Sequence, residues 1–573
     1  MSKQKSYPRS TLPAELHDFR NFLYVVWNAI GLPDPTPLQY EVAQWLQFGP
    51  DRSITCALRG LGKSFVAVTY GMWCLGMDPT INVLIVSASK EKADDNVQFA
   101  YRLLELEILE HLKPRKELGE RSRATSFDVR GADISQAPSL RSKGITGQIT
   151  GSRADVIIPD DIEVPTNSWT QTMRDKLAHM VTEFEAVIKP DPTGTWGRIA
   201  YLGTPHTAES LYWHLTEQGY GMRMWPAQYP EDIAIYRGFL APGIAGRLLD
   251  DPGLAGEATD TRFPLHDLQE RRASMGNTAY QMQFMLNSDL SDEQRYPLKL
   301  KDCILMDVDD AAAPERVIYA GTLDYHDGEV PNMGFRSDRW QKPMSIMGSW
   351  EKFEEILMAV DPSGRGKDEC AYVVVARLAG QLYLLDWGGF LDGYDEQTLT
   401  RLASIAARYK VGRIIAEGNF GDGMWGRLFG PYILRSGHQA HFEEVTVHGR
   451  KEDRILDILE PLFQQHRFVV NRSRVLSEIE ELQARDDGAT GGTYNLFSQA
   501  THICREPGAL KHDDRLDALA TAALHIGESL SLSPNQEFAQ RKNEAYEASI
   551  QEFMDGWDEQ HGRPIQEETW LEL

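Results

Sequence analysis

The segment ALRGLGKSF at residues 57–65 limits what this chain can fold into more than any other part of it. The β-rich run RSITCAL leads into the segment, and a helical run over residues 65–75 follows it. A strand, a glycine-containing loop and a helix in this order are typical of α/β sheets, where backbone N–H groups at the helix N-terminus point at phosphate oxygens. The segment therefore predicts an α/β domain with a nucleotide site.

The residues of this loop have separate expected roles. Lys63 adds a point charge, the Ser64 hydroxyl reaches Mg²⁺, and Gly60 and Gly62 allow the tight turn. Ala57 stands where the usual pattern has its first glycine. The alternative is a strand–helix turn that holds a lysine by chance, but the strand before the loop and the helix after it favour nucleotide binding.

Bulk composition excludes several classes of protein. A chain of 573 residues is too long for one core, and its length suggests about three to four domains. Apolar content is 42%, and no apolar run reaches about 18 residues, so we expect neither disorder nor a membrane span. The N-terminus lacks the apolar region of a signal peptide, and five scattered cysteines predict reduced thiols without a zinc site. A net charge of −25 argues against static coating of DNA, but not against transient gripping.

Short apolar runs recur along the first half of the chain. After an amphipathic opening helix over residues 14–30, strands are expected before the P-loop, at 81–89, at 154–161 and at 198–205, with a weaker candidate from Met222. Near-continuous apolar strands separated by helical segments predict a mainly parallel sheet that is covered on both faces.

The second half changes character twice. Residues 286–350 are polar and rich in Asp, Pro and Gly, which predicts a linker or a peripheral excursion. From Glu351 three strand candidates, EILMAVDPS, AYVVVARLAG and QLYLLDWGGF, precede a helix, the strand RIIAEGNF, another helix and a final helix through DDRLDALATAALHI. This order predicts a mixed α/β domain of the ribonuclease H-like class.

These patterns divide the chain into four expected regions. They are a P-loop NTPase domain with a helicase-like sheet and a lid region, a linker, a ribonuclease H-like domain and an acidic tail, at residues 1–285, 286–350, 351–528 and 529–573. The tail has ten acidic and three basic residues, a net charge of −7. It carries isolated large apolar residues at Phe538, Tyr546, Phe553, Trp557 and Trp570. Such a segment cannot build a core but can dock on a partner, although a merely solubilising tail is the alternative.

Acidic residues after the strand ADVIIPDD supply the second half of a nucleotide site. Asp160 at the strand end is expected to hold Mg²⁺, and Asp161 is the expected base for the attacking water, with Glu163 as the runner-up. Pro159 is awkward inside a strand because it removes a ladder donor. Without the P-loop upstream, two acids here would be read as a strand-end turn.

Four further residues are candidates for the same site. Thr204, at the end of another strand, is a candidate sensor of the γ-phosphate, and Gln39 is a candidate reader of the adenine edge. Arg59 and Arg153 are candidates for stabilising charge in the transition state. A structural role is the alternative for each of them.

Scattered carboxylates in the second half predict a metal site. Asp361 and Glu417 each end a strand, while Asp513, Asp514 and Asp517 share a helix face by their spacing. Mg²⁺ and Mn²⁺ prefer oxygen ligands, and two such ions about 3.5–4 Å apart can clamp both oxygens of a phosphodiester displacement. The alternative is that the acids are simply solvated.

Taken together, these residues resemble the large terminase subunit of tailed double-stranded DNA phages, in the short-tailed podovirus branch. The resemblance covers roughly residues 15–530 and rests on RGLGKSF, LIVSASKE, GITGQITGSRADVIIPDD, YLGTP, VDPSGRGKDE, EGNFGDGM and GALKHDDRLDALA in this order. It departs from the family pattern at Ala57, and at Asp161, where the family has a catalytic Glu.

The resemblance implies an ATPase that pumps double-stranded DNA into the prohead and a nuclease that cuts concatemeric DNA. Matching motifs imply phosphate and Mg²⁺ contacts for Lys63, Ser64 and Asp160 and coupling by Thr204, with Asp361, Glu417, Asp514 and a possible fourth ligand, Asp517, in the nuclease. Expected cofactors are ATP and Mg²⁺ or Mn²⁺.

Expected partners are the small terminase subunit and the portal protein, engaged by a homo-oligomeric ring, a pentamer by resemblance, in the host cytoplasm. A repair-type helicase–nuclease is a competing reading, but no second motor domain follows Thr204. A nucleotide-switched scaffold with degenerate acids is the non-enzymatic alternative.

Overall fold

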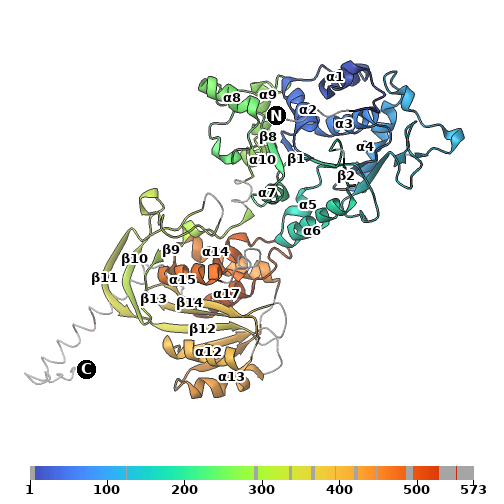
Figure 1. The fold of residues 1–573 in the computed structure, drawn as a ribbon. Helices are drawn as coiled ribbons and strands as arrows, with labels where there is room; N and C mark the ends of the chain where they lie inside the picture. Colours follow the sequence, from blue (N-terminus) through green and yellow to red (C-terminus); the bar gives the residue numbers. More distant parts are fainter. Residues whose placement is uncertain are drawn as a thin grey trace, which may run out of the picture. The chain divides into compact units, whose positions relative to one another are not determined.

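The computed structural model divides the chain into two compact units, Met1–Arg295 and Tyr296–Leu573 (Figure 1). It describes residues 7–527 together with 547 and 550, except for 124, 193, 289–294, 335–337, 363–367, 394, 418–423, 447–448 and 485–493. The apolar residues expected to anchor the acidic tail therefore lie outside the described residues. No helix in the described part combines the length and the apolar character needed to cross a membrane.

The first unit is an α/β domain. Its helices are α1 (Phe19–Ala29), α2 (Pro37–Phe48), α3 (Lys63–Met77), α4 (Lys90–Leu103), α5 (Pro165–Ser168), α6 (Gln171–Val187), α7 (Leu211–Glu217), α8 (Pro242–Asp250), α9 (Leu265–Met275) and α10 (Asn277–Gln283). Its strands are β1 (Arg52–Ala57), β2 (Val83–Ser87), β3 (Ser122–Arg123), β4 (Ser126–Phe127), β5 (Leu140–Gly144), β6 (Val156–Asp160), β7 (Arg198–Gly203) and β8 (Gly221–Trp225).

These strands form one mainly parallel sheet in the order β3-β4-β5-β2-β6-β7-β1-β8. Only the pairs β3–β4 and β4–β5 are antiparallel, so the expected parallel sheet and all five strand candidates are confirmed. Because β7 lies between β6 and β1 and all three are parallel, their carboxyl ends share one edge. That edge positions the P-loop, Asp160 and Thr204 together.

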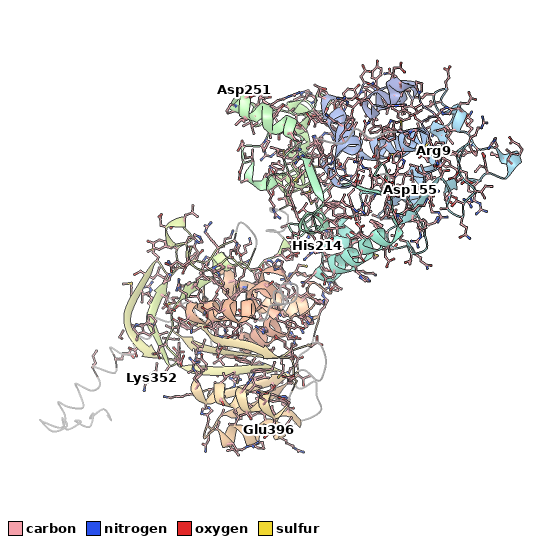
Figure 2. The ribbon with its side chains drawn as sticks, in the orientation of Figure 1. Arg9, Asp155, His214, Asp251, Lys352 and Glu396 are labelled. Carbon is pink, nitrogen blue, oxygen red and sulfur yellow. The ribbon has the colours of Figure 1, made fainter. Side chains whose placement is uncertain are left out.

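The second unit is a mixed α/β domain. Its strands are β9 (Ile304–Met306), β10 (Ala312–Ile318), β11 (Ser345–Lys352), β12 (Glu355–Asp361), β13 (Cys370–Leu378), β14 (Gln381–Phe390), β15 (Arg413–Glu417), β16 (His441–Val445) and β17 (Phe468–Asn471). Its helices are α12 (Glu396–Arg408), α13 (Met424–Arg435), α14 (Lys451–Gln464), α15 (Arg472–Ala484), α16 (Leu496–His502) and α17 (Asp514–Gly527). Figure 2 shows the side chains, with Lys352 at the end of β11 and Glu396 at the start of α12, both exposed.

The central sheet has the order β16-β15-β12-β13-β14-β17-β9. Strands β12, β13 and β14 form an antiparallel meander, and β15 and β16 continue the sheet in parallel beyond β12. Helices α12 and α13 cover one face, and α14, α15 and α17 cover the other (Figure 1). This arrangement confirms the ribonuclease H-like class expected from the strand order.

The structure differs from the linker expected at 286–350, whereas the other expectation for this segment, a peripheral excursion, fits the separate two-stranded sheet of β10 and β11. From Tyr296 onward these residues belong to the second unit: β9 extends the central sheet beside β17, and β10 pairs with β11. Leu298, Leu305 and Trp340 are fully buried in its core. The sequence pattern did not reveal these core residues because β9 is only three residues long, and Leu298 and Trp340 stand among polar residues, so no periodic pattern marks the segment.

Candidate functional sites

The phosphate loop is built by two glycines with left-handed backbone. Gly60 has φ 91° and Gly62, which precedes α3, has φ 88°. A Cβ on Gly60 would lie 2.8 Å from the Phe263 ring. Both positions thus require glycine, and Gly60 does so also because Phe263 lies close to the loop.

Lys63 lies under this loop with its charge enclosed. Its ammonium donates to the carbonyls of Ala57 and Leu58 at 2.6 and 3.2 Å and to Thr204 Oγ1 at 3.1 Å. Burial lowers the pKa of Lys63, while the carboxylates of Asp161 and Asp160 act in the opposite direction. The predicted coupling residue thus contacts the predicted phosphate lysine.

Asp160 is fully buried at the end of β6. Its Oδ2 accepts hydrogen bonds from Ser64 Oγ at 2.8 Å and Asn96 Nδ2 at 3.0 Å. Its Oδ1 has no hydrogen-bond partner within the described residues. Burial, together with Asp161, raises the pKa of Asp160. The Ser64 hydroxyl and the Asp160 carboxylate, with its unsatisfied Oδ1, are hard oxygen donors of the kind that a divalent cation prefers. These residues therefore fit such an ion.

Asp161 differs from its neighbour in backbone and in charge. It adopts φ 47°, which is uncommon for a non-glycine residue, and its side chain is 31% exposed. Lys92 donates to its Oδ2 at 3.0 Å. Burial would raise the pKa of Asp161, but Lys63 and Lys92 outweigh burial and lower it. Asp161 is thus an ionised acceptor that water can reach.

Glu163 is engaged elsewhere. Its carboxylate accepts from the His206 N–H at 2.9 Å, from Ser210 Oγ at 2.8 Å and from the Leu211 N–H at 2.7 Å. The side chain is 1% exposed, and burial raises its pKa. The carboxylate therefore joins the end of β6 to the start of α7.

Gln39 and Arg262 hold the loop from outside. Gln39 Oε1 accepts from the Thr36 N–H at 2.9 Å, and its Nε2 donates to the Leu61 carbonyl at 2.6 Å. Arg262 donates to the same carbonyl at 3.0 Å, and Arg59 donates to Gln283 Oε1 at 2.8 Å. The Gln39 amide is thus occupied with positioning the loop, and its expected contact with adenine stays a prediction.

Arg153 is a correction. It precedes β6, so it lies at the amino end of a five-residue strand whose carboxyl end carries Asp160. At about 3.3 Å per residue the strand separates the two by more than 15 Å. Arg153 instead donates to the Ala186 carbonyl near the end of α6 at 2.6 Å. The position of Arg153 before the expected strand already indicated the amino end, away from the acids at the carboxyl end.

A groove opens beside Ser64. It has a volume of about 740 Å³, and its lining is mostly apolar, with Phe65 and Phe99 in edge-to-face contact at 5.0 Å. Asn96, which contacts Asp160, also lines it. The groove is therefore continuous with the phosphate site. The sequence patterns assigned no role to Lys92 or Asn96, although both lie on α4, the helix that follows β2, and β2 is the strand next to β6.

The carboxylate site of the second unit lies where two parallel neighbours end. Val360 of β12 pairs with Ala416 of β15, so Asp361 and Glu417 follow side by side. Asp517 of α17 joins them, and one oxygen of each carboxylate lies within 4.8 Å of the others. Burial raises the pKa of Asp361 well above its usual value, and Asp517 adds to the rise. Three clustered oxygen donors fit a divalent cation.

Asp514 falls into a second group. Its carboxylate lies within 4.8 Å of candidate ligand atoms of Asp368 and His512, and its Oδ2 accepts from the Glu369 N–H at 3.1 Å. Burial raises the pKa of Asp514 to about 6. Asp513 is different again, because its Oδ1 accepts from Lys451 at 2.8 Å. The structure thus divides the predicted set and adds Asp368 and His512, which lie in the quoted motifs VDPSGRGKDE and GALKHDDRLDALA but were given no role of their own.

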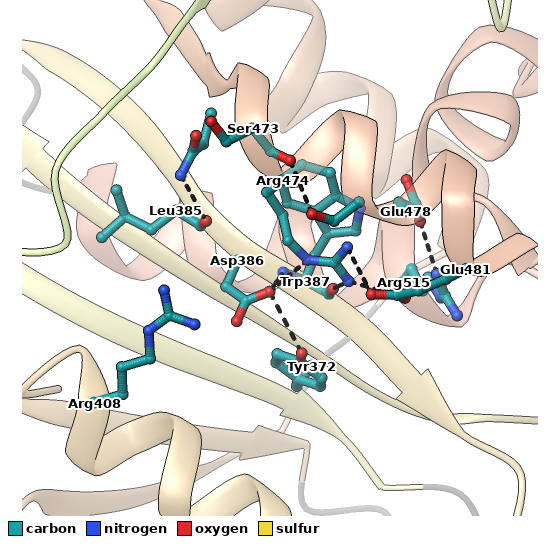
Figure 3. Close-up of polar contacts among 12 residues, drawn as sticks. Tyr372, Leu385, Asp386, Trp387, Arg408, Ser473, Arg474, Glu478, Glu481 and Arg515 are labelled. Atoms are coloured by element: carbon teal, nitrogen blue, oxygen red, sulfur yellow. Dashed lines mark hydrogen bonds and ion pairs between the residues drawn. The ribbon is translucent and has the colours of Figure 1, made fainter.

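A buried arginine fixes the helix that carries these acids. Arg515 of α17 donates to both oxygens of Glu369 at 2.7 and 2.9 Å and to Glu478 of α15 at 2.8 Å. Beside it Arg474 ties α15 to β14 through Asp386 at 2.8 Å (Figure 3). The orientation of Asp514 and Asp517 therefore depends on an ion network behind them.

Comparisons with known proteins identify the family of this chain. Residues 360–468 match the family described as Terminase Bacteriophage T7, Ribonuclease H-like domain. The terminase large subunit of Enterobacteria phage T3 is 41% identical over 546 residues, covering 94% of this chain and 91% of that protein. Among solved structures, the HK97 bacteriophage large terminase is 14% identical, with a TM-score of 0.40, over 83% of this chain and 92% of its own. The SPP1 large terminase nuclease domain with bound Mn is 18% identical, with a TM-score of 0.20, over 30% of this chain and 88% of its own.

Proposed function

Because this chain belongs to the terminase large subunit family, we propose that its two sites divide the family's work between the two units. The family packages viral DNA with an ATP-driven motor and cuts it with an endonuclease, using a nucleotide and a divalent metal. We assign the motor to residues 1–295 and the nuclease to residues 296–527. The proposal rests on two clusters in one chain. Lys63, Thr204 and Asp160 meet at one sheet edge, and Asp361, Glu417 and Asp517 meet at another.

In the motor, Lys63 and the loop N–H groups bind the phosphates, and Ser64 with Asp160 would hold a divalent cation, which would neutralise charge on the phosphates. Asp161 takes the proton of the attacking water, because it is ionised and partly exposed while Glu163 has its oxygens occupied. Thr204, which is hydrogen-bonded to Lys63, couples the loss of the γ-phosphate to β7. Arg59 remains a candidate for stabilising charge in the transition state.

The base of the nucleotide is proposed to lie along Phe65 in the groove beside Ser64. The groove is contiguous with the phosphate site and offers an apolar, aromatic wall for a ring. The alternative position of the base, beside Gln39, is less favoured because the Gln39 amide already forms hydrogen bonds with Thr36 and Leu61.

In the nuclease, Asp361, Glu417 and Asp517 are proposed to hold one cation, and Asp514 to serve a second position. The bound cation would activate water and stabilise charge on the scissile phosphate. We propose Mg²⁺ as the ion of both sites, with Mn²⁺ as a substitute in the nuclease. The chain's own part is to align its carboxylates, and Arg515 does this by fixing α17.

Members of this family work on DNA with packaging partners. For this chain we propose double-stranded DNA, the small terminase subunit and the portal of the prohead, with a pentameric ring in the host cytoplasm. The competing readings, a repair-type helicase–nuclease and a non-enzymatic scaffold, are not supported by the family relationship.

Incubation of the protein with plasmid DNA tests this function. Cleavage is expected with Mg²⁺ or Mn²⁺ and not with EDTA, and ATP hydrolysis is expected in the same preparation. Binding of ATP without metal-dependent cleavage would favour the scaffold.

A further inference from the structure

A lysine lies among the nuclease carboxylates. Lys451, the first residue of α14, places its ammonium 2.8 Å from Asp513 Oδ1 and 3.1 Å from Asp517 Oδ2. Arg454, one turn along the helix, donates to the other oxygen of Asp517. Asp517 is also the carboxylate that completes the group with Asp361 and Glu417. The Lys451 ammonium and a bound metal ion would therefore both contact the Asp517 carboxylate.

Carboxylates surround the charge of this lysine: Asp513 and Asp517 pair with its ammonium, and Asp361 belongs to the same acidic group as Asp517. The Asp517 side chain is 3% exposed, so its interaction with the ammonium is little screened by solvent. Lys451 itself is 36% exposed and can swing toward solvent or toward an anion.

We propose that Lys451 is an internal counter-ion of the nuclease site, which lowers the affinity of the Asp361, Glu417 and Asp517 carboxylates for a divalent cation. The inference rests on the proposed metal-dependent nuclease. A cation that enters must share Asp517 with an ammonium of like charge, and this repulsion weakens its binding. Without metal the same ammonium relieves repulsion among the acids. The site is thus stable while empty of metal, and a DNA phosphate that draws Lys451 away would favour metal loading.

Calorimetric titration of the full-length protein with Mn²⁺, without DNA, tests the proposal. An Asp160→Asn background confines the signal to the nuclease site. Lys451→Gln is expected to bind Mn²⁺ at least tenfold more tightly, because the competing charge is gone. Arg450→Gln is the matched control: it removes the same charge one residue away, from a side chain that pairs with Asp453, and should change affinity less than twofold.

Thermal unfolding gives a second readout that does not depend on cleavage. In EDTA, Lys451→Gln should have a lower Tm than the parent protein, because the carboxylates lose the ammonium that offsets their mutual repulsion. Mn²⁺ should then raise its Tm by more than it raises the parent's. Lys451→Met repeats both measurements if the glutamine variant fails to fold, and Lys451→Arg, which keeps the charge, should behave like the parent.

Equal or weaker Mn²⁺ binding by the uncharged variants would overturn the proposal. Tighter binding by Lys451→Arg would also overturn it. A parent protein that neither binds Mn²⁺ nor cuts plasmid DNA would instead contradict the nuclease function itself.

Discussion

Single residues decide the chemistry of the motor site, and the two candidate bases show how. Asp161 and Glu163 are two positions apart on a strand end, yet one faces Lys63 and Lys92 while the other caps α7. Their side chains follow different paths because Asp161 has a left-handed backbone. Such a conformation is costly for a non-glycine residue and is retained where the surroundings enforce it.

Asp161→Asn is expected to lower ATP turnover by about a hundredfold or more, with little change in ATP affinity, because a neutral amide cannot accept the proton. Glu163→Gln should instead lower the free energy of unfolding by about 1–3 kcal/mol, since one amide hydrogen would face a donor. Steady-state kinetics, ATP binding and thermal unfolding of both variants check this. Loss of turnover in Glu163→Gln with unchanged stability would make Glu163 the base.

Phe65 gives a second test at this scale. Phe65→Ala should weaken ATP binding about tenfold, because a ring contact is worth about 1–1.5 kcal/mol. Binding of inorganic tripolyphosphate, which has no base, should stay within twofold of wild type. Calorimetry with the two ligands separates the base contact from the phosphate contacts, and equal weakening of both would refute the proposed position of the base.

At the scale of elements, helix α17 shows how packing turns a pattern into a site. Its apolar face packs against β12 and β13, and Arg515, 4% exposed, joins it to Glu369 and Glu478. Burial raises the pKa of Glu478, so the arginine offsets a charge that the core disfavours. Breaking such a pair leaves buried carboxylates without compensation.

Arg515→Met is therefore expected to lower the free energy of unfolding by about 3–5 kcal/mol. Arg20→Met makes the same chemical change at a partly exposed pair with Asp18 and should cost less than about 1 kcal/mol. Chemical denaturation compares the two variants. Adding Glu369→Gln and Glu478→Gln to Arg515→Met should recover part of the loss, and no recovery would show that the arginine acts through packing alone.

At the scale of the whole molecule, the two sites belong to units with separate cores. Lys63→Ala should reduce ATP turnover by at least a hundredfold and leave metal-dependent plasmid cleavage intact. Asp361→Asn should reduce plasmid cleavage by at least a hundredfold and leave ATP turnover intact. Lys90→Ala, at an exposed lysine that pairs with Asp94, is the control for the first variant. Loss of both activities in either variant would show that the sites depend on each other for folding.

The acidic tail is the other whole-molecule question. We expect deletion of residues 534–573 to leave ATP turnover and plasmid cleavage intact while abolishing packaging in a reconstituted prohead assay, because the tail is proposed to dock on the portal. Normal packaging by the truncated protein would leave the tail a solubilising role. Loss of either enzyme activity would place it inside a fold.

Short-range sequence patterns were enough to predict the local units of the fold. The P-loop, the apolar strands and the acids at their ends are set by short-range pattern, so the parallel sheet, the ribonuclease H-like order and the joining of Lys63, Asp160 and Thr204 could be predicted. Strand-end residues of adjacent parallel strands must meet at one edge, which made those predictions safe.

Which charges pair depends on the folded arrangement of distant segments. Lys92 and Lys451 come from helices whose neighbours are fixed by long-range packing, and nothing in their local sequence marks the carboxylates they contact. The same holds for β9, whose three residues gain their place from β17 more than 160 positions later. Periodicity reports what one segment buries, whereas ion pairs and short strands depend on the partner that folding brings to them.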